Sequence, residues 1–506
     1  MGAIIGIDLG TTNSAISYVE NSVYKIIPNK GKNTTPSVVY FDKSGNAVVG
    51  EDAKKRIITN PDRVIFEIKR KMGTNETIKI DEEYYKPEEI SAIILKHLKE
   101  VAEKYLGENV DRAVITVPSN FNNSQREATK IAGKIAGLEV ELLLNEPTAA
   151  AIAYGLDNMH IKGNILVYDL GGGTFDVTIL EANNGKFTVK SSEGNMNIGG
   201  EDFDEILSKY IIDQVEKDTG IDLYNNKFAI SQIRKIAEEV KKNLAYSKSE
   251  EIDTVLSGVF DEFSMPVSIK MDISRETFDE LIKDLVNKTY ETINKALKVA
   301  NLTDNDIDVV IPVGGSTKNN LVREMLNRFG DKLKFDINPD EVVAIGAGIQ
   351  AGIINGDFNR ETVPEIKDVC PYTLGTSVVR YEEGRGWIHG IYDPLIHKNM
   401  QLPAVGKNIY TTMIDYQDNV VVDAYQGDNI YAKENKLIGS IILRDLTPLP
   451  AGKEGIEIEF IYSKDGTLEV NAKSLTSGSK VNTKLKLENV MSEDEIDYAI
   501  SRINKN

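Results

Sequence analysis

The N-terminal stretch IIGIDLGTTNSAIS (Ile4–Ser17) is an apolar run that ends at Asp8 and leads into Gly10 and four small polar residues. Such a run predicts a buried strand, and a strand that only reverses direction needs no more than one Asn-Gly or Asp-Gly pair. This turn instead carries hydroxyl groups and has a carboxylate at its entry. The arrangement recurs as ILVYDLGGGTFDVTIL (Ile165–Leu180), and a third glycine turn, VGGSTK (Val313–Lys318), ends another apolar run. The repetition indicates a shared role for the turns.

The chemistry of these turns favours the binding of phosphate groups. Glycine exposes backbone amides, and amides beside Thr and Ser hydroxyls bind phosphate oxygens. Asp8 and Asp169 stand at two of the strand ends, where carboxylates can hold a hydrated Mg²⁺. One strand-glycine turn is usually only a turn, but three of them predict a cleft between two similar half-domains that holds a nucleotide across its phosphates.

Two other glycine motifs are excluded. The chain has no Gly-x-x-x-x-Gly-Lys-Ser/Thr motif, so it is not a P-loop protein. The segment GAGIQAG (Gly346–Gly352) has the wrong spacing for a dinucleotide fingerprint. Its small residues predict close packing of a helix instead.

Composition narrows the class of protein. With 506 residues, 41% of them hydrophobic and 27% charged, the chain is long enough for more than one globular domain. A net charge of -19 argues against a nucleic-acid surface, which needs clustered Lys and Arg. The single cysteine, Cys370, cannot form an internal disulfide and suits a reducing compartment. No apolar run has the length of a membrane span, and no basic signal segment precedes Asp8, so we expect a cytoplasmic protein with no membrane or nucleic-acid partner.

The pattern of apolar and polar residues changes along the chain. Residues 1–356 alternate short apolar runs with amphipathic helices, which predicts α/β layers with a largely parallel central sheet. Residues 357–368 are polar and contain proline, as in a linker. Residues 369–490 show short strands with period-two alternation, which predicts a small β domain. Helix returns in 491–506, where Ser492 and Glu495 have the spacing of a capping box.

Five motifs then resemble one family. They are DLGTTNS (Asp8–Ser14), NEPTAAAIAYGL (Asn145–Leu156), DLGGGTFDV (Asp169–Val177), GGEDFD (Gly199–Asp204) and NPDEVVAIGA (Asn338–Ala347). Together they resemble the seventy-kilodalton heat-shock chaperones of the DnaK type, over nearly the whole chain, and the β-rich half is most similar to the HscC branch. The resemblance implies an α/β, actin-like (ribonuclease-H-like) ATPase domain in two lobes. A small β-sandwich that binds extended peptide and the start of a helical lid would follow it.

The resemblance also implies roles for individual residues. Lys69 would orient the water that attacks the γ-phosphate, and Glu146, Thr174 and Asp176 would complete the hydrogen bonds of that water. Asp8 and Asp169 would position Mg²⁺ through its waters, with K⁺ beside them. The residues implied to contact ATP or ADP are Gly10, Thr11, Thr12, Asn13, Gly171, Gly172, Gly173, Gly199, Gly200, Glu201, Glu238, Lys241, Lys242, Gly314, Gly315, Ser316 and Lys318.

Further residues are implied for the β domain and its communication with the ATPase domain. Pro118 and Arg126 match the switch that relays the nucleotide state. From the residues alone, plain sandwich core is the favoured interpretation of the positions that the resemblance places around a peptide groove. Those positions are Val378, Val379, Tyr410, Met413, Val420 and Val422.

Three departures from the family pattern bear on mechanism. Lys242 and Lys318 stand where relatives often have arginines that sandwich adenine, and Ala245 replaces a common serine. Lysine lacks the planar guanidinium, so we expect a weaker clamp on the base. The linker has only Val363 and Ile366 among polar residues, which predicts weak coupling or coupling through other contacts. The chain also ends after the first lid residues, so we expect fast peptide exchange.

The implied partners are unfolded or partly folded client polypeptides, a J-domain co-chaperone and a nucleotide-exchange factor, and we expect a monomer. Two other classes share the nucleotide fold. A sugar or metabolite kinase would transfer phosphate to a bound small molecule, and an actin-like filament protein would polymerise with nucleotide. The β-rich C-terminal domain argues against both.

Overall fold

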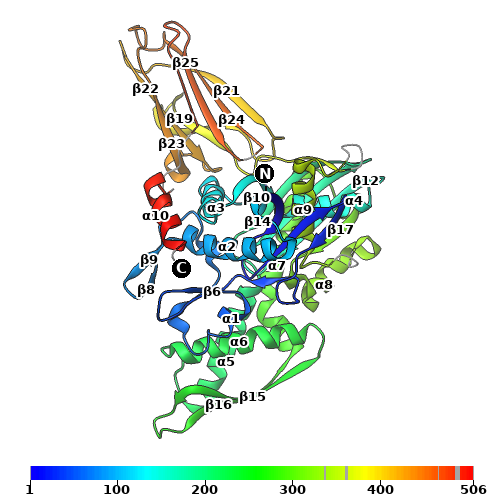
Figure 1. Ribbon diagram of the computed structural model, residues 1–506. Helices are drawn as coiled ribbons and strands as arrows, with labels where there is room; N and C mark the ends of the chain where they lie inside the picture. Colours follow the sequence, from blue (N-terminus) through cyan, green and yellow to red (C-terminus); the bar gives the residue numbers. More distant parts are fainter. Residues whose placement is uncertain (1, 335–337, 359–362, 465, 485–490, 505–506) are drawn as a thin grey trace.

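The computed structural model describes residues 2–334, 338–358, 363–464, 466–484 and 491–504. An α/β part runs from β1 (Ala3–Asp8) to α9 (Val342–Asn355), and a β-rich part runs from β19 (Leu374–Glu382) to β26 (Lys480–Lys484). Figure 1 shows the β-rich part as yellow and orange strands above the α/β part. No helix among these residues is long and apolar enough to cross a membrane.

Two sheets with matching strand patterns form the centre of the α/β part. The first has the order β11-β10-β1-β2-β3, and the second has the order β17-β12-β13-β14-β18. Their further strands are β2 (Asn13–Glu20), β3 (Val23–Ile26), β10 (Val110–Val117), β11 (Glu139–Asn145), β12 (Lys162–Leu170), β13 (Phe175–Asn183), β14 (Lys186–Asn195), β17 (Ile307–Val313) and β18 (Glu365–Lys367). In each sheet a leading strand, β1 or β12, has a hairpin partner on one side and a parallel neighbour on the other.

The prediction of a largely parallel sheet is wrong, because both sheets are mixed. β1 and β2 are antiparallel with Asp8 opposite Ala15, and β12 and β13 are antiparallel with Asp169 opposite Asp176. A turn of a few residues joins strands only as a hairpin, whereas parallel neighbours need a crossover of a dozen or more residues. The short glycine turns therefore impose the antiparallel pairs.

Helices cover the two sheets. α9 packs against β1, β2 and α4 (Glu146–Asp157). A Cβ added at Gly346 would lie 1.9 Å from the carbonyl oxygen of Ala149, and one added at Gly348 would lie 2.0 Å from Ser17 Oγ. The prediction that GAGIQAG serves close helix packing is confirmed.

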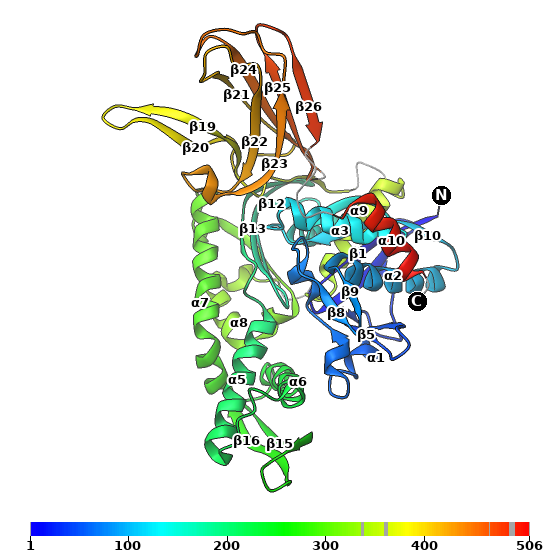
Figure 2. The ribbon, with the colours of Figure 1, turned by 90° about the vertical axis from the view of Figure 1, so that its left-hand side faces the viewer.

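The second sheet carries a helical extension. α7 (Arg275–Ala300) is N-capped by Ser274, whose side chain accepts a hydrogen bond from Thr277 N. Figure 2 shows α7 along one side of the molecule, with the β15–β16 hairpin at the end farthest from the β-rich part. The elements of this region are α5 (Gly200–Thr219), α6 (Lys227–Leu244), β15 (Ser249–Phe260) and β16 (Pro266–Ser274).

A pair of four-stranded sheets shares one core in the β-rich part. Their orders are β20-β19-β22-β23 and β21-β24-β25-β26, and the side chains of Leu374, Phe460 and Val470 are buried between them. The remaining strands are β20 (Gly386–Ile396), β21 (Ala404–Thr411), β22 (Val420–Gln426), β23 (Lys436–Leu443), β24 (Gly455–Tyr462) and β25 (Leu468–Ser474). The arrangement is a β-sandwich.

Contacts from β18, from the β-rich part and from the C-terminal helix join the chain beyond α9 to the α/β part. β18, inside the segment predicted as linker, pairs in parallel with β14, although residues 359–362 of that segment lie outside the described residues. Lys398 forms an ion pair of 2.9 Å with the buried Glu193 of β14. α10 (Glu493–Ile503) packs against α2 (Pro87–Leu106) and α3 (Asn123–Ile135). The polar linker thus adds a strand to the α/β part.

The predicted capping box at the start of α10 is confirmed. Ser492 Oγ accepts a hydrogen bond of 3.3 Å from Glu495 N, and Glu495 Oε2 accepts one of 2.8 Å from Ser492 N. Residues 485–490, just before it, and residues 505–506 lie outside the described residues.

Candidate functional site

The three glycine turns meet at one cavity of about 490 Å³. Most residues singled out from the sequence for the nucleotide line it. These are Asp8, Gly10, Thr11, Thr12, Asn13, Lys69, Glu146, Asp169, Gly171, Gly172, Thr174, Gly200, Glu201, Glu238, Lys241, Lys242, Gly314, Gly315, Ser316 and Lys318. Gly173, Gly199 and Asp176 do not belong to the lining.

The first two turns lie in direct contact. A Cβ added at Gly172 would lie 1.8 Å from Thr12 Oγ1, and one added at Gly173 would lie 2.7 Å from Thr11 Cγ2. Gly199 stands behind them, because its Cβ would lie 2.2 Å from the carbonyl oxygen of Gly172. Gly172, Gly173 and Gly199 have no positive φ. Glycine is therefore required at these three positions by the close approach of neighbouring atoms and not by backbone conformation. Gly173 and Gly199 thus shape the cavity although they do not line it.

The third turn differs in its backbone. Gly314 has a φ of 83°, in the region that favours glycine, and its added Cβ would lie 2.3 Å from the carbonyl oxygen of Leu170. Ser316 Oγ donates a hydrogen bond of 2.8 Å to the carbonyl oxygen of Gly171. The third turn is thereby fixed against the second.

A buried ion pair occupies one wall of the cavity. Lys69 Nζ donates hydrogen bonds of 2.5 Å to Glu146 Oε1 and 2.6 Å to the carbonyl oxygen of Leu9. Lys69 lies in the short helix η2 (Ile68–Lys71) and is only 5% exposed, and Glu146 begins α4. A buried charge needs a partner, so the two side chains fix each other at the cavity wall.

Buried carboxylates gather beside this pair. Burial, with the nearby Glu146 charge, raises the pKa of Asp8 to about 7. Burial and the carboxylates around it raise the pKa of Asp169 well above its ordinary value. Asp169 Oδ2 is buried with no hydrogen-bond partner. A site with several acids and one lysine fits a divalent cation, whose charge would keep the acids ionised.

The donor set fits a cation held through water. Among the described residues no three His, Cys, Asp or Glu side chains are close enough to bind a metal ion directly. Hydrated Mg²⁺ usually keeps several waters and needs only one or two carboxylates. Asp8 and Asp169 meet that requirement.

Asp176 lies opposite the cavity-lining Asp169 in the β12–β13 hairpin and connects it to the region beneath the β-rich part. Its Oδ1 accepts a hydrogen bond of 2.6 Å from Ser119 Oγ, and burial raises its pKa to about 7. Ser119 follows Pro118 in the chain, and its carbonyl oxygen accepts a hydrogen bond of 3.2 Å from Arg126 Nη2. The same Nη2 donates one of 2.6 Å to Asn145 Oδ1. Pro118 and Arg126 thus lie between the cavity and the β-rich part.

The β-rich part touches that segment directly. Tyr462 Oη donates a hydrogen bond of 3.0 Å to Asn123 Oδ1, and Lys436 Nζ donates one of 3.0 Å to Ser124 Oγ. Asp368 Oδ2 accepts hydrogen bonds from Asn145 Nδ2 at 2.8 Å and Thr148 Oγ1 at 2.9 Å. Asn145 and Thr148 belong to the NEPT segment that also supplies Glu146.

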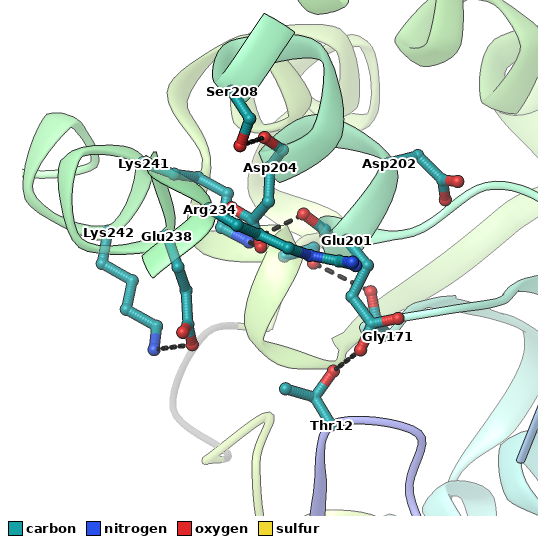
Figure 3. A network of polar contacts seen from close by, with 12 residues as sticks. Thr12, Gly171, Glu201, Asp202, Asp204, Ser208, Arg234, Glu238, Lys241 and Lys242 are labelled. Carbon is teal, nitrogen blue, oxygen red and sulfur yellow. Dashed lines mark hydrogen bonds and ion pairs between the residues drawn. The ribbon is translucent and has the colours of Figure 1, made fainter. Parts of the chain in front are cut away.

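Carboxylates of α5 and α6 form the opposite end of the cavity (Figure 3). Thr12 Oγ1 donates a hydrogen bond of 2.7 Å to Glu201 Oε1. Burial, with Glu67, raises the pKa of Glu201 to about 8. Lys241 Nζ donates hydrogen bonds of 2.7 Å to Asp204 Oδ2 and to the carbonyl oxygen of Gly200. These contacts tie the first turn to the start of α5.

Ion pairs also join the N-terminal region, which supplies Lys54 and Arg70, to α5 and α6 across the cavity. Glu238 accepts from Lys54 at 2.8 Å and from Lys242 at 2.5 Å. Burial opposes ionisation of Glu238, but the two lysines outweigh it and lower its pKa to about 2. Arg70 Nη2 donates to Asp202 Oδ2 at 2.6 Å and to the carbonyl oxygen of Gly173 at 3.0 Å.

Sequence reasoning missed several of these residues. Arg70 directly follows Lys69, and Asp204 ends the GGEDFD motif. Both could have been found from their position next to residues that the motifs already assigned to the site. Arg234 pairs with Glu67 and lies over the Phe66 ring, but it sits in an ordinary amphipathic helix without a motif. Only the fold brings Arg234 to this region.

The residues implied for a peptide groove differ in how exposed they are in the structure. Val378 and Val379 are half-buried on β19, and Met413 is exposed. Tyr410 Oη donates a hydrogen bond of 2.7 Å to Asp393 Oδ2. Val420 packs at the edge of the sandwich core, whereas Val422 is 2% exposed within it. The side chain of Val422 therefore faces the core and presents no surface to a peptide.

Comparison with known families agrees with this architecture. The sequence model of the family described as Hsp70 protein matches residues 4–506. Proteins of this family are ATPases and ATP-dependent chaperones that bind ATP or ADP with Mg²⁺. They act on unfolded clients together with J-domain and nucleotide-exchange co-chaperones. Because the match spans almost the entire chain, this protein belongs to the Hsp70 family.

Proposed function

We propose that the chain is a DnaK-type chaperone, most similar to the HscC branch in its β-rich half. It hydrolyses ATP slowly in the cavity between two actin-like lobes, and its β-sandwich binds extended apolar segments of unfolded or specific clients. The carrying observation is the convergence of three glycine turns, the Lys69–Glu146 pair and two buried aspartates on one cavity. The proposed division is an ATPase domain over 1–356, a linker over 357–368, a peptide-binding domain over 369–490 and the start of a lid helix over 491–506.

In this proposal the nucleotide phosphates lie against the glycine turns. Asp8 and Asp169 hold Mg²⁺ through its waters, with K⁺ beside them. When bound, Mg²⁺ would supply charge neutralisation for the phosphate oxygens. The unpartnered Asp169 Oδ2 and the raised pKa values of both aspartates support this assignment, because each favours a cation at that point.

Lys69 is proposed to orient the attacking water, with Glu146, Thr174 and Asp176 as further hydrogen-bond partners of that water. The geometry supports Lys69 because its ammonium is held at the cavity wall by two acceptors and has a third N–H available. Phosphoryl transfer depends mainly on positioning and on charge stabilisation. A fixed cationic donor provides both.

The test of this assignment is a single-turnover measurement of ATP hydrolysis in Lys69→Ala. We expect the rate constant to fall by about 100-fold or more, as when a fixed transition-state donor is removed. Lys71→Ala is the matched control, because Lys71 ends the same short helix but is exposed and pairs with Glu76. A wild-type rate in Lys69→Ala would refute the role of Lys69.

Loss of Lys69 also leaves Glu146 buried without its partner, which costs about 3–5 kcal/mol in stability. The double variant Lys69→Met/Glu146→Gln removes both charges. We expect it to regain thermal stability while its hydrolysis stays slow. That result would separate the catalytic effect from the structural one.

Coupling between the α/β part and the β-rich part is proposed to run through β18, Asp368 and Arg126. The test compares release of a labelled apolar peptide after addition of ATP or ADP. Faster release with ATP is the expected result, and Asp368→Ala should reduce the difference because it removes two hydrogen bonds to the NEPT segment. Equal release rates with both nucleotides in the wild-type protein would contradict the proposed coupling.

A further inference from the structure

Among the described residues, the end of the cavity away from the Lys69–Glu146 pair has no planar cation in its lining. Lys242 Nζ donates to Glu238 Oε1 at 2.5 Å, and Lys318 Nζ donates to Asp340 Oδ2 at 2.6 Å. Each ammonium group therefore has a carboxylate partner, and neither provides a flat surface. Among the described residues that line the cavity there is no arginine. A flat heterocycle bound here needs another stacking surface.

One exposed aromatic ring lines the same end. Tyr246 is 77% exposed, whereas Phe203, the other aromatic residue of the lining, is fully buried. Tyr246 lies just beyond the last residue of α6, Leu244, and its N–H donates a hydrogen bond of 2.8 Å to the carbonyl oxygen of Asn243. That bond fixes the backbone at the cavity rim and leaves the ring outside the helix.

The ring is available for a ligand. Within the described parts of the chain its hydroxyl has no hydrogen bond and its ring contacts no other aromatic or cationic group. Its neighbour Ala245 also lines the cavity and has no polar side-chain atom. This rim therefore offers an aromatic face, but no side-chain hydrogen-bonding group at position 245 to read the edge of a base.

We propose that Tyr246 is a nucleotide-binding residue whose ring stacks on the base of the bound nucleotide. The inference rests on the proposed function, since it requires a nucleotide with its phosphates at the glycine turns. Aromatic rings stack on nucleobases in a way that does not depend on hydrogen bonds. At this rim the stack replaces the planar cationic contact that Lys242 and Lys318 do not provide.

The test is isothermal titration calorimetry of the full chain with Mg²⁺ and two probes, ADP and pyrophosphate. In Tyr246→Ala we expect the Kd for ADP to rise about tenfold and the Kd for pyrophosphate to stay unchanged, because only ADP carries a base. Tyr246→Phe keeps the ring and should bind ADP like the wild-type protein. Phe263→Ala is the matched control, since Phe263 is also 77% exposed but does not line the cavity.

Three results separate the possibilities. Wild-type affinity for ADP in Tyr246→Ala overturns the stacking role, while the proposed function stands. An equal loss of ADP and pyrophosphate binding also overturns it, because the substitution then acts on the whole cavity. Failure of the wild-type chain to bind ADP refutes the proposed function itself, and the inference with it.

Discussion

The two Asp-Leu-Gly hairpin turns begin alike but are built differently. The first carries Thr11 and Thr12 side chains, and the second has Gly172 and Gly173 at the positions that face them. Thr12 Oγ1 occupies the space that a Cβ at Gly172 would need, at a separation of 1.8 Å. The hydroxyls of one turn are therefore accommodated by the missing side chains of the other.

This difference explains why the repeat is imperfect. If both turns carried threonines, the backbones could not approach each other; if both carried glycines, no hydroxyl would reach Glu201, which accepts from Thr12 at 2.7 Å. The pair of turns works as one unit. A substitution in either turn should consequently shift the position of the other turn.

Among changes to the two turns, the largest expected effect comes from Gly172→Ala. Its Cβ would overlap Thr12 Oγ1, so the turns must separate, at a cost of about 1–3 kcal/mol for overpacking. We expect a lower Tm and loss of measurable ADP binding. Differential scanning calorimetry and titration with ADP measure both quantities.

Two further variants sharpen that result. Gly171→Ala is the control within the same turn, because the nearest atom to its added Cβ, Thr174 O, lies at an ordinary 3.7 Å. Its Tm should stay close to the wild-type value. The double variant Thr12→Gly/Gly172→Ala removes the overlapping side chain and should regain stability over Gly172→Ala. No recovery in the double variant would show that the turns do not act as one unit.

Three buried aspartates at the two turns, Asp8, Asp169 and Asp176, give the next effect, which depends on pH. In the cation-free protein the pKa values of Asp8 and Asp176 are raised to about 7, above the unfolded value of about 4. The folded state therefore binds more protons between pH 4 and 7, and stability falls as pH rises through that window. Each such group contributes a slope of about 1.4 kcal/mol per pH unit.

Thermal unfolding from pH 5 to 8 in EDTA measures this slope. We expect Tm to fall across the range, and Asp8→Asn or Asp169→Asn to flatten the fall because each removes a carboxylate whose pKa is raised. Addition of Mg²⁺ with ADP should flatten it as well. An unchanged slope in both variants would contradict the account of the acid cluster.

The smallest effect is expected from Thr12→Val. It removes the hydrogen bond to Glu201, worth about 1 kcal/mol, and should weaken ADP binding by roughly fivefold. Thr12→Ser keeps the hydroxyl and should bind like the wild-type protein. A larger loss in Thr12→Ser than in Thr12→Val would show that shape, not the hydroxyl, matters at this position.

The sequence predicted the turns, the strands around them and the convergence of most site residues, because these depend on short motifs with a physical meaning. It predicted the sheet directions wrongly, although the brevity of the loop between Asp8 and Ala15 implies a hairpin. Arg234 and Tyr246 could not be found, since neither belongs to a motif: Arg234 on α6 gains its pairing with Glu67, and Tyr246 just beyond α6 its place in the cavity lining, only in the folded chain. For Val422 the residues alone favoured sandwich core and only the family resemblance implied a peptide groove; the side chain lies 2% exposed in the core.

The short strand β18 has a further consequence. It joins the edge of the second sheet over only three residue pairs, Lys186–Glu365 to Thr188–Lys367, and Ile366 is its apolar side chain against the core. So small a strand stays on the sheet edge mainly because the chain tethers it there. The tether gives β18 an effective concentration in the millimolar range, as for a short linker. A free peptide with the sequence VPEIK, at comparable concentration, is therefore a competitor for that edge, able to displace β18 without touching the nucleotide.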